Sequence, residues 1–248
     1  MNPAPSIVLI HGVGLDHTMW DKVSPGLGNR RVVTYDLLGH GSAGPLPSGS
    51  DLSTLIDQLR SVCDAEASPV DIVGFSLGAL IAQGFALSHP GRVRRLILVS
   101  GVFNRSADER LAILQRVADV RDGGYLNNVA IAIDRWFAPE FAAAHPDVLA
   151  AVTERMMNND MASYANAYEI FATADEQLAT QVHHINCPTL VVTGELDPRS
   201  TPAMSHALAA TVTNGRAVVL PGARHLTPFE VPGALARLIT TFVEEPDA

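Results

Sequence analysis

Six short apolar runs rich in β-branched residues recur along the 248-residue chain, and each one ends in turn-forming residues. Within a run the apolar character is nearly continuous rather than alternating, which is typical of parallel strands covered on both faces. The predicted strands are 7–10, 32–35, 70–75, 96–99, 190–193 and 217–220. Helical patterns lie between several of them or after the last, at 52–63, 77–88, 203–210 and 233–245. This alternation predicts an α/β fold with a mostly parallel sheet flanked by helices.

One interval, from Phe103 to Ile185, contains helix-like stretches but no convincing strand. The stretches are 111–120, 126–136, 146–157 and 161–171. A helical insertion between the fourth and fifth strands is expected to lie as a lid over the carboxyl edge of the sheet, where open α/β sheets bind ligands. We therefore predict a core domain made of residues 1–102 and 186–248, with a helical lid at 103–185.

Charge and composition exclude several classes of protein. The net charge is −9 and Lys22 is the only lysine, so neither nucleic acid nor an anionic membrane is an expected partner. No window approaches the roughly 18 consecutive apolar residues that span a bilayer, and residues 1–10 lack the charged start of a secretory signal. Cys63 and Cys187 are far apart, as expected of free thiols in a reducing compartment. We predict a cytoplasmic protein with a small-molecule substrate.

No cofactor or metal site is predicted. Residues 39–44, Gly-His-Gly-Ser-Ala-Gly, match a dinucleotide-binding fingerprint, but Pro45 and Pro47 prevent the helix that this fingerprint must open. The histidines and carboxylates show no paired spacing of the kind that holds a metal ion.

The pentapeptide Gly74-Phe75-Ser76-Leu77-Gly78 joins the apolar run 70–75 to an apolar helical pattern. A strand, a sharp turn and a helix form the context in which the serine of Gly-x-Ser-x-Gly acts as a nucleophile. The turn strains the backbone at the serine, so its neighbours must be small, and the two glycines meet that demand. The hydroxyl would project above the sheet at the positive end of the following helix. We predict that Ser76 is a catalytic nucleophile.

A serine hydroxyl needs a base that takes its proton and an acid that orients the base. Asp197 follows the run 190–193 in a tight turn, and His225 follows the run 217–220 in a glycine-containing loop. Of the nine histidines, only His225 follows a late predicted strand in such a loop. Glu195 is the alternative acid, in which case Asp197 would merely cap the turn or the following helix. We predict Asp197 and His225 as the partners of Ser76.

An oxyanion formed at Ser76 would need hydrogen-bond donors. The backbone N–H of Leu77, the residue after the nucleophile, is one candidate. The N–H of Val13, in the loop after the first strand, is the other, because the His-Gly pair before it leaves little bulk. His11 itself is expected to be structural rather than catalytic.

Five sequence blocks, taken in order, resemble the α/β-hydrolase superfamily along nearly the whole chain. They are 11–14, 36–41, 74–78, 194–197 and 222–225. The chain order Ser, Asp, His is also the order expected of that superfamily. Within it, the stretches 135–141 and 159–175 are similar to those of 3-oxoadipate enol-lactonases. This resemblance implies hydrolysis of a small lactone or ester that carries carboxylates, with Arg135 and Trp136 as candidate substrate contacts. The alternatives are that Trp136 belongs to the lid core and that Arg135 is a solvated charge.

The substrate and reaction stay open at this point. The same Ser-His-Asp set could cleave a carbon–carbon bond in a ring-fission diketone or act as a general carboxylesterase, and a receptor-like protein with little turnover is a third reading. An anionic substrate would need a local basic patch to overcome the net charge, with candidates Arg94, Arg95, Arg105 and Arg135. Tyr35 and Tyr164 are undecided between pocket and core.

The predicted strand 32–35 is expected to lie at an edge of the sheet. Members of the superfamily usually have about two antiparallel strands ahead of the first strand found here, whereas only residues 1–6 precede Ile7. An exposed edge is normally covered or charged. We expect either a loop or a second copy of the chain, forming a homodimer, to cover it.

Overall fold

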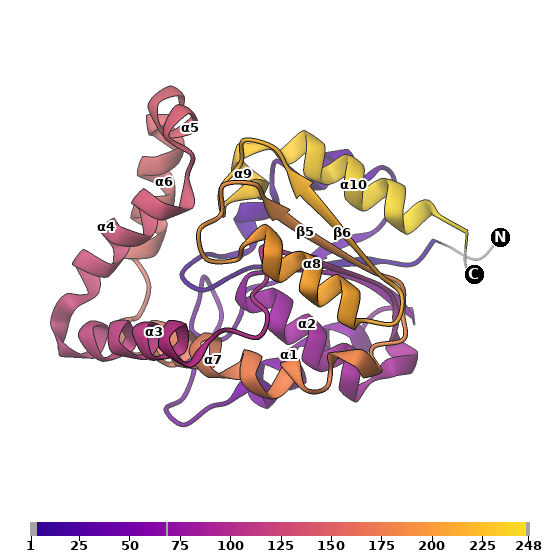
Figure 1. Cartoon of the computed structure of the whole chain (residues 1–248), viewed down its shortest axis with the longest axis horizontal. Coiled ribbons are helices and arrows are strands. Elements are labelled where there is room, and N and C mark those ends of the chain that lie inside the picture. Colours follow the sequence, from indigo (N-terminus) through magenta and orange to yellow (C-terminus); the bar gives the residue numbers. More distant parts are fainter. Residues whose placement is uncertain (1–3, 68, 247–248) are drawn as a thin grey trace.

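The computed structural model describes residues 4–67 and 69–246 (Figure 1). A six-stranded sheet forms its centre, in the order β2-β1-β3-β4-β5-β6, and every neighbouring pair is parallel. The strands are β1 (Ile7–Ile10), β2 (Val32–Thr34), β3 (Val70–Phe75), β4 (Val93–Val99), β5 (Thr189–Gly194) and β6 (Gly215–Leu220). The predicted parallel α/β architecture is confirmed. The predicted edge strand, β2, does lie at an edge; whether a second copy covers it stays a prediction.

Both faces of the four central strands are buried, which explains their nearly continuous apolar runs, whereas the edge strands β2 and β6 are half-buried. In β1, Val8 and Ile10 belong to one apolar core, whereas Ile7 and Leu9 belong to the other. Figure 1 shows α1 (Leu52–Asp64), α2 (Leu77–Ser88) and α8 (Pro202–Thr211) on one side of the sheet and α10 (Pro232–Glu244) on the other. The short helix α9 (Thr227–Glu230) precedes α10 and was not predicted.

Five helices lie between β4 and β5. They are α3 (Ala107–Asp119), α4 (Tyr125–Trp136), α5 (Pro139–Ala144), α6 (Pro146–Met157) and α7 (Met161–Ala179). Helices α4, α5 and α6 stand beyond the ends of the strand arrows, whereas α7 packs against α2 of the core (Figure 1). The predicted division into a core domain and a lid stays a prediction, as does the lid's function as a cover.

Three helices of the insertion differ from the sequence prediction by more than one residue, and one of them, α3, begins four residues before the predicted start at Leu111. Helix α5 was missed, and α7 extends eight residues beyond the predicted end at Phe171. The extension contains Asp175, a buried carboxylate, and the polar Glu176 and Gln177. Because of these polar residues, the end of α7 lacks the apolar spacing by which a helix is predicted, and its buried side carries the charged Asp175. Asp175 is accommodated because Arg105 pairs with it.

Strand β4 begins at Val93, three residues earlier than predicted. The early residues were missed because two of them, Arg94 and Arg95, interrupt the apolar run. These arginines are accommodated at the amino end of the strand. Arg94 Nη2 lies 2.6 Å from Asp71 Oδ2, and Arg95 Nη2 donates to the carbonyl oxygen of Glu245 at 2.5 Å.

Across the described residues, no helix combines the length and the apolar character needed to cross a bilayer. Nor does the described part of the chain bring three His, Cys, Asp or Glu side chains together as a metal-binding group.

Candidate active site

Ser76 occupies a strained turn between β3 and α2. Its backbone has φ 53° and ψ −110°, a combination that side-chain-bearing residues rarely adopt. The flanking glycines allow this turn: a Cβ at Gly74 would lie 2.2 Å from the carbonyl oxygen of Gly78, and one at Gly78 would lie 2.5 Å from that of Ile10. The local sequence thus fixes Ser76 at the carboxyl end of β3, directly before the first residue of α2.

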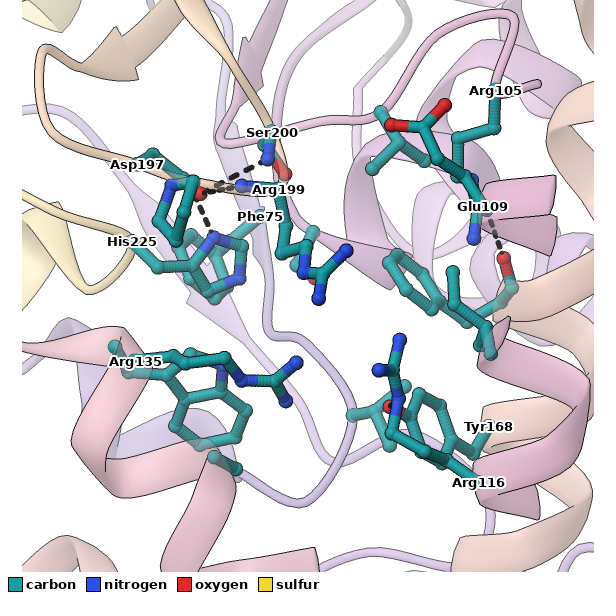
Figure 2. A pocket seen from close by; sticks show the side chains of 18 of the residues that line it. Phe75, Arg105, Glu109, Arg116, Arg135, Tyr168, Asp197, Arg199, Ser200 and His225 are labelled. Carbon is teal, nitrogen blue, oxygen red and sulfur yellow. Dashed lines mark hydrogen bonds and ion pairs between the residues drawn. The ribbon is translucent and has the colours of Figure 1, made fainter. Parts of the chain in front are cut away.

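His225 and Asp197 form a buried pair. His225 Nδ1 lies 2.6 Å from Asp197 Oδ2, and the other carboxylate oxygen accepts hydrogen bonds from the backbone N–H groups of Arg199 and Ser200 (Figure 2). These bonds fix the carboxylate so that it can hold the Nδ1 edge of the imidazole. The alternative acid, Glu195, lies apart from this pair: it is exposed and accepts a hydrogen bond from the N–H of Gly222.

The loop after β1 lies beside Ser76. A Cβ at Gly12 would be 3.1 Å from Ser76 Cβ, so the loop approaches the serine as closely as a glycine permits. Val13 follows Gly12 and lines the same pocket as Ser76, and Leu77 opens α2. Neither of their N–H groups donates to another group within the described part of the chain. Both N–H groups thus stay candidates for the oxyanion donors, and that role stays a prediction.

His11 and His40 are buried and lie outside the pocket. His11 Nε2 accepts a hydrogen bond from the N–H of Leu37 at 2.9 Å, and the two imidazole rings are 5.2 Å apart. Burial lowers the pKa of His11 to about 4 and that of His40 to about 3, so both are neutral near pH 7. His11 thus fixes the loop after β2, in agreement with a structural role.

Ser76, Asp197 and His225 open onto one pocket between the sheet edge and the helical insertion. Its apolar wall consists of Val13, Phe75, Val102, Ile113, Ala132, Trp136, Tyr164 and Phe171. Trp136 covers the imidazole: the two ring centroids are 6.0 Å apart and the planes differ by 28°. Tyr164 lies here too and accepts a hydrogen bond from Asn128 Nδ2, whereas Tyr35 does not line this pocket and packs, half-buried, against one of the apolar cores.

The basic residues of the pocket differ from the predicted set. Arg135 lines the pocket, and its contact with a substrate stays a prediction; Arg105 lines the pocket while paired with Asp175. Arg94 and Arg95 were wrong candidates, because they lie at the opposite end of the sheet, as described above. Sequence reasoning missed two others, Arg116 and Arg199 (Figure 2).

A signal for Arg199 was available in the sequence, since it lies two residues after Asp197 at the carboxyl end of β5. Arg116 offered no such signal. It lies in α3, and the side of that helix that faces the pocket follows only from the packing of the insertion.

A model of the α/β hydrolase family matches residues 7–238. The chain belongs to this family. It is accordingly a hydrolase, with the six-stranded parallel sheet and flanking helices described above.

Relatives of this α/β hydrolase cover nearly all of it. It is 28% identical over 244 residues to the (E)-2-((N-methylformamido)methylene)succinate hydrolase of Acinetobacter baylyi. This alignment covers 96% of this chain and 90% of the relative. It is 26% identical to 3-oxoadipate enol-lactonase 2 of the same organism, over 93% of this chain and 85% of the relative. The crystal structure of the enol-lactonase from Burkholderia xenovorans superimposes with a TM-score of 0.91 and 27% identity, covering 98% and 93% of the two chains.

Proposed function

We propose that this α/β hydrolase is a serine hydrolase that cleaves a small carboxylate-bearing ester or enol-lactone. The observation that carries the proposal is the buried pair of Asp197 and His225, which opens onto the same pocket as Ser76. A hydroxyl becomes nucleophilic when an oriented imidazole takes its proton, and the strained Ser76 shares its pocket with such an imidazole.

The mechanism follows from the positions of these groups. Ser76 Oγ attacks the substrate carbonyl carbon while the imidazole of His225 takes the hydroxyl proton, and Asp197 stabilises the imidazolium that forms. The N–H groups of Val13 and Leu77 donate to the resulting oxyanion. His225 then gives the proton to the leaving oxygen, and an acyl-serine remains. In the second half His225 takes a proton from a water molecule that attacks the acyl carbon, and it returns this proton to Ser76 Oγ as the acid product leaves.

The pocket supports a substrate that is small, partly apolar and anionic. Aromatic and aliphatic side chains cover most of its wall, and several arginines complete it. Guanidinium groups bind carboxylates through two parallel hydrogen bonds. The names of the relatives point the same way, since an enol-lactone of 3-oxoadipate carries one carboxylate and a substituted succinate carries two.

The test compares hydrolysis of a carboxylate-bearing enol-lactone with that of a neutral p-nitrophenyl ester, by the wild type and by Ser76→Ala. We expect fast opening of the lactone ring that collapses in the variant. Turnover of the neutral ester alone, lost in the variant, would contradict the substrate class and leave the Ser76 mechanism in place. Turnover that survives in Ser76→Ala would contradict the mechanism.

A further inference from the structure

Three arginines converge on one part of the pocket from three different elements. Arg116 comes from α3, Arg135 from α4 and Arg199 from the loop after β5. Figure 2 shows their guanidinium groups pointing into the same open space, Arg135 and Arg199 from the side of His225 and Arg116 from the opposite side. The pocket therefore presents positive charge on both sides of the space next to His225.

These arginines lack carboxylate partners within residues 4–67 and 69–246. Other arginines of the insertion do have them: Arg105 pairs with Asp175, and Arg121 Nη2 lies 2.7 Å from Glu169 Oε2. Ion pairing is thus common in this part of the molecule, and the three pocket arginines depart from it.

Among the described residues, Arg116 and Arg135 each form a hydrogen bond through Nε, and Arg135 also interacts with the Tyr168 hydroxyl. Arg116 Nε donates to the Tyr168 hydroxyl at 3.3 Å, and Arg135 Nε donates to the carbonyl oxygen of Ile131 at 3.2 Å. A guanidinium held through Nε presents its two Nη groups as a fork, which matches the two oxygens of a carboxylate.

The positive charges of Arg116, Arg135 and Arg199 repel one another. Burial lowers the pKa of Arg135, and the nearby charges of Arg116 and Arg199 lower it further. Arg116 and Arg135 are half-buried against apolar walls, where like charges are screened less than in open water. A bound anion would relieve this repulsion.

Two carboxylates line the pocket, those of Asp197 and Glu109. Only Asp197 is paired with a catalytic residue. Asp197 uses both oxygens on His225 and on two backbone N–H groups, as described above. Glu109 accepts hydrogen bonds from the N–H and hydroxyl of Ser106 and is the remaining carboxylate. Three guanidinium groups facing one carboxylate leave an excess of two positive charges.

From this excess we propose that the substrate carries two carboxylates, one held by Arg116 and the other by Arg135 and Arg199. The reacting carbonyl then lies between them, next to Ser76; this last placement rests on the proposed function, whereas the binding of two carboxylates does not. Arg116, Arg135 and Arg199 are the residues that determine specificity for a small dicarboxylate.

The test measures binding without turnover, by isothermal titration of the wild-type protein at low ionic strength. Succinate and glutarate are compared with their monoamides, which keep the shape and remove one charge. We expect each dicarboxylate to bind at least about tenfold more tightly than its monoamide. Arg116→Gln and Arg199→Gln are each expected to remove that preference. Arg121→Gln, a change at an exposed arginine of the same insertion, is the matched control and is expected to keep it.

Equal binding of the dicarboxylates and their monoamides would overturn the inference, and this comparison needs no variant. Equal losses in Arg121→Gln and Arg116→Gln would overturn it too, because attraction to general positive charge would then explain the binding. Neither result bears on Ser76. Conversely, a clear preference for dicarboxylates together with turnover that survives in Ser76→Ala would leave this inference standing and remove the proposed function.

Discussion

The indole of Trp136 covers the imidazole of His225, with 6.0 Å between the ring centroids, and the backbone carbonyl of Trp136 accepts a hydrogen bond from the N–H of Leu226. The insertion and the His225 loop are thus joined at the site by two independent contacts. One is a ring contact and the other is a backbone bond that any residue at position 136 could make. The side chain and the backbone therefore have separable roles.

Replacing Trp136 tests the role of the side chain. Trp136→Ala keeps the backbone bond but uncovers the imidazole, so water gains access and the proton transfers lose a fixed base. We expect kcat/KM to fall by about tenfold, corresponding to roughly 1.4 kcal/mol of transition-state stabilisation. Trp136→Phe, which keeps an aromatic cover, is expected to retain most of the activity. Steady-state kinetics of the two variants check this, and equal activity of Trp136→Ala and the wild type would contradict it.

Asp197 and Glu195 form a matched pair for testing the acid. Asp197→Asn removes the charge that stabilises the imidazolium and is expected to lower kcat by about 10³- to 10⁴-fold. Glu195→Gln changes an exposed side chain that accepts a bond from Gly222, and its kcat is expected to stay within about twofold of the wild type. Steady-state rates at saturating ester decide between them. A large loss in Glu195→Gln with activity kept in Asp197→Asn would reverse the assignment.

The strain at Ser76 has a measurable stability consequence. Ala shares the unfavourable φ of 53°, whereas Gly adopts it readily. We expect Ser76→Gly to be more stable than Ser76→Ala by about 1 kcal/mol in urea unfolding, after the larger entropy of glycine in the unfolded chain is subtracted. Ala118→Gly, at an exposed position within α3, is the control and should lose about 0.5–1 kcal/mol. A Ser76→Gly protein less stable than Ser76→Ala would show that the turn is not strained.

Much of this site could be predicted because its groups follow strands. Ser76 comes directly after an apolar run, Asp197 and His225 lie in the turns after later runs, and parallel strands bring their carboxyl ends to one edge. Arg116 could not be placed in the same way, because its direction depends on how α3 packs within the insertion. Arg94 and Arg95 were wrong candidates for a related reason, because a sequence does not show which group pairs with a charged residue. Their partners, Asp71 and the carbonyl of Glu245, lie far from them along the chain.

The buried histidines His11 and His40 predict how stability depends on pH. Their pKa values of about 4 and about 3 lie below the ordinary 6.5 that they regain on unfolding. The unfolded chain therefore binds more protons than the folded chain below pH 6.5, and the free energy of unfolding falls as the pH falls towards 4. Near pH 5 the two groups together give a slope of about 2.5 kcal/mol per pH unit.

Urea unfolding between pH 6 and pH 5 measures this slope. In that range His17, whose pKa is raised by its hydrogen bond to Asp36, is largely protonated in both states and contributes little. His40→Gln removes one of the two titrating groups and is expected to reduce the slope by about half. His206→Gln, at an exposed histidine, serves as the control and should leave it unchanged. An unchanged slope in His40→Gln would contradict the assignment.

The central claim, that Ser76 is the nucleophile, is tested most directly by covalent labelling with a neutral fluorophosphonate, which does not depend on the substrate class. Intact-protein mass spectrometry should show a single adduct on the wild type, and peptide mapping should place it on Ser76. The account predicts no adduct on Ser76→Ala and slower labelling of Asp197→Asn. An adduct on another residue, or equal labelling of Ser76→Ala, would contradict it.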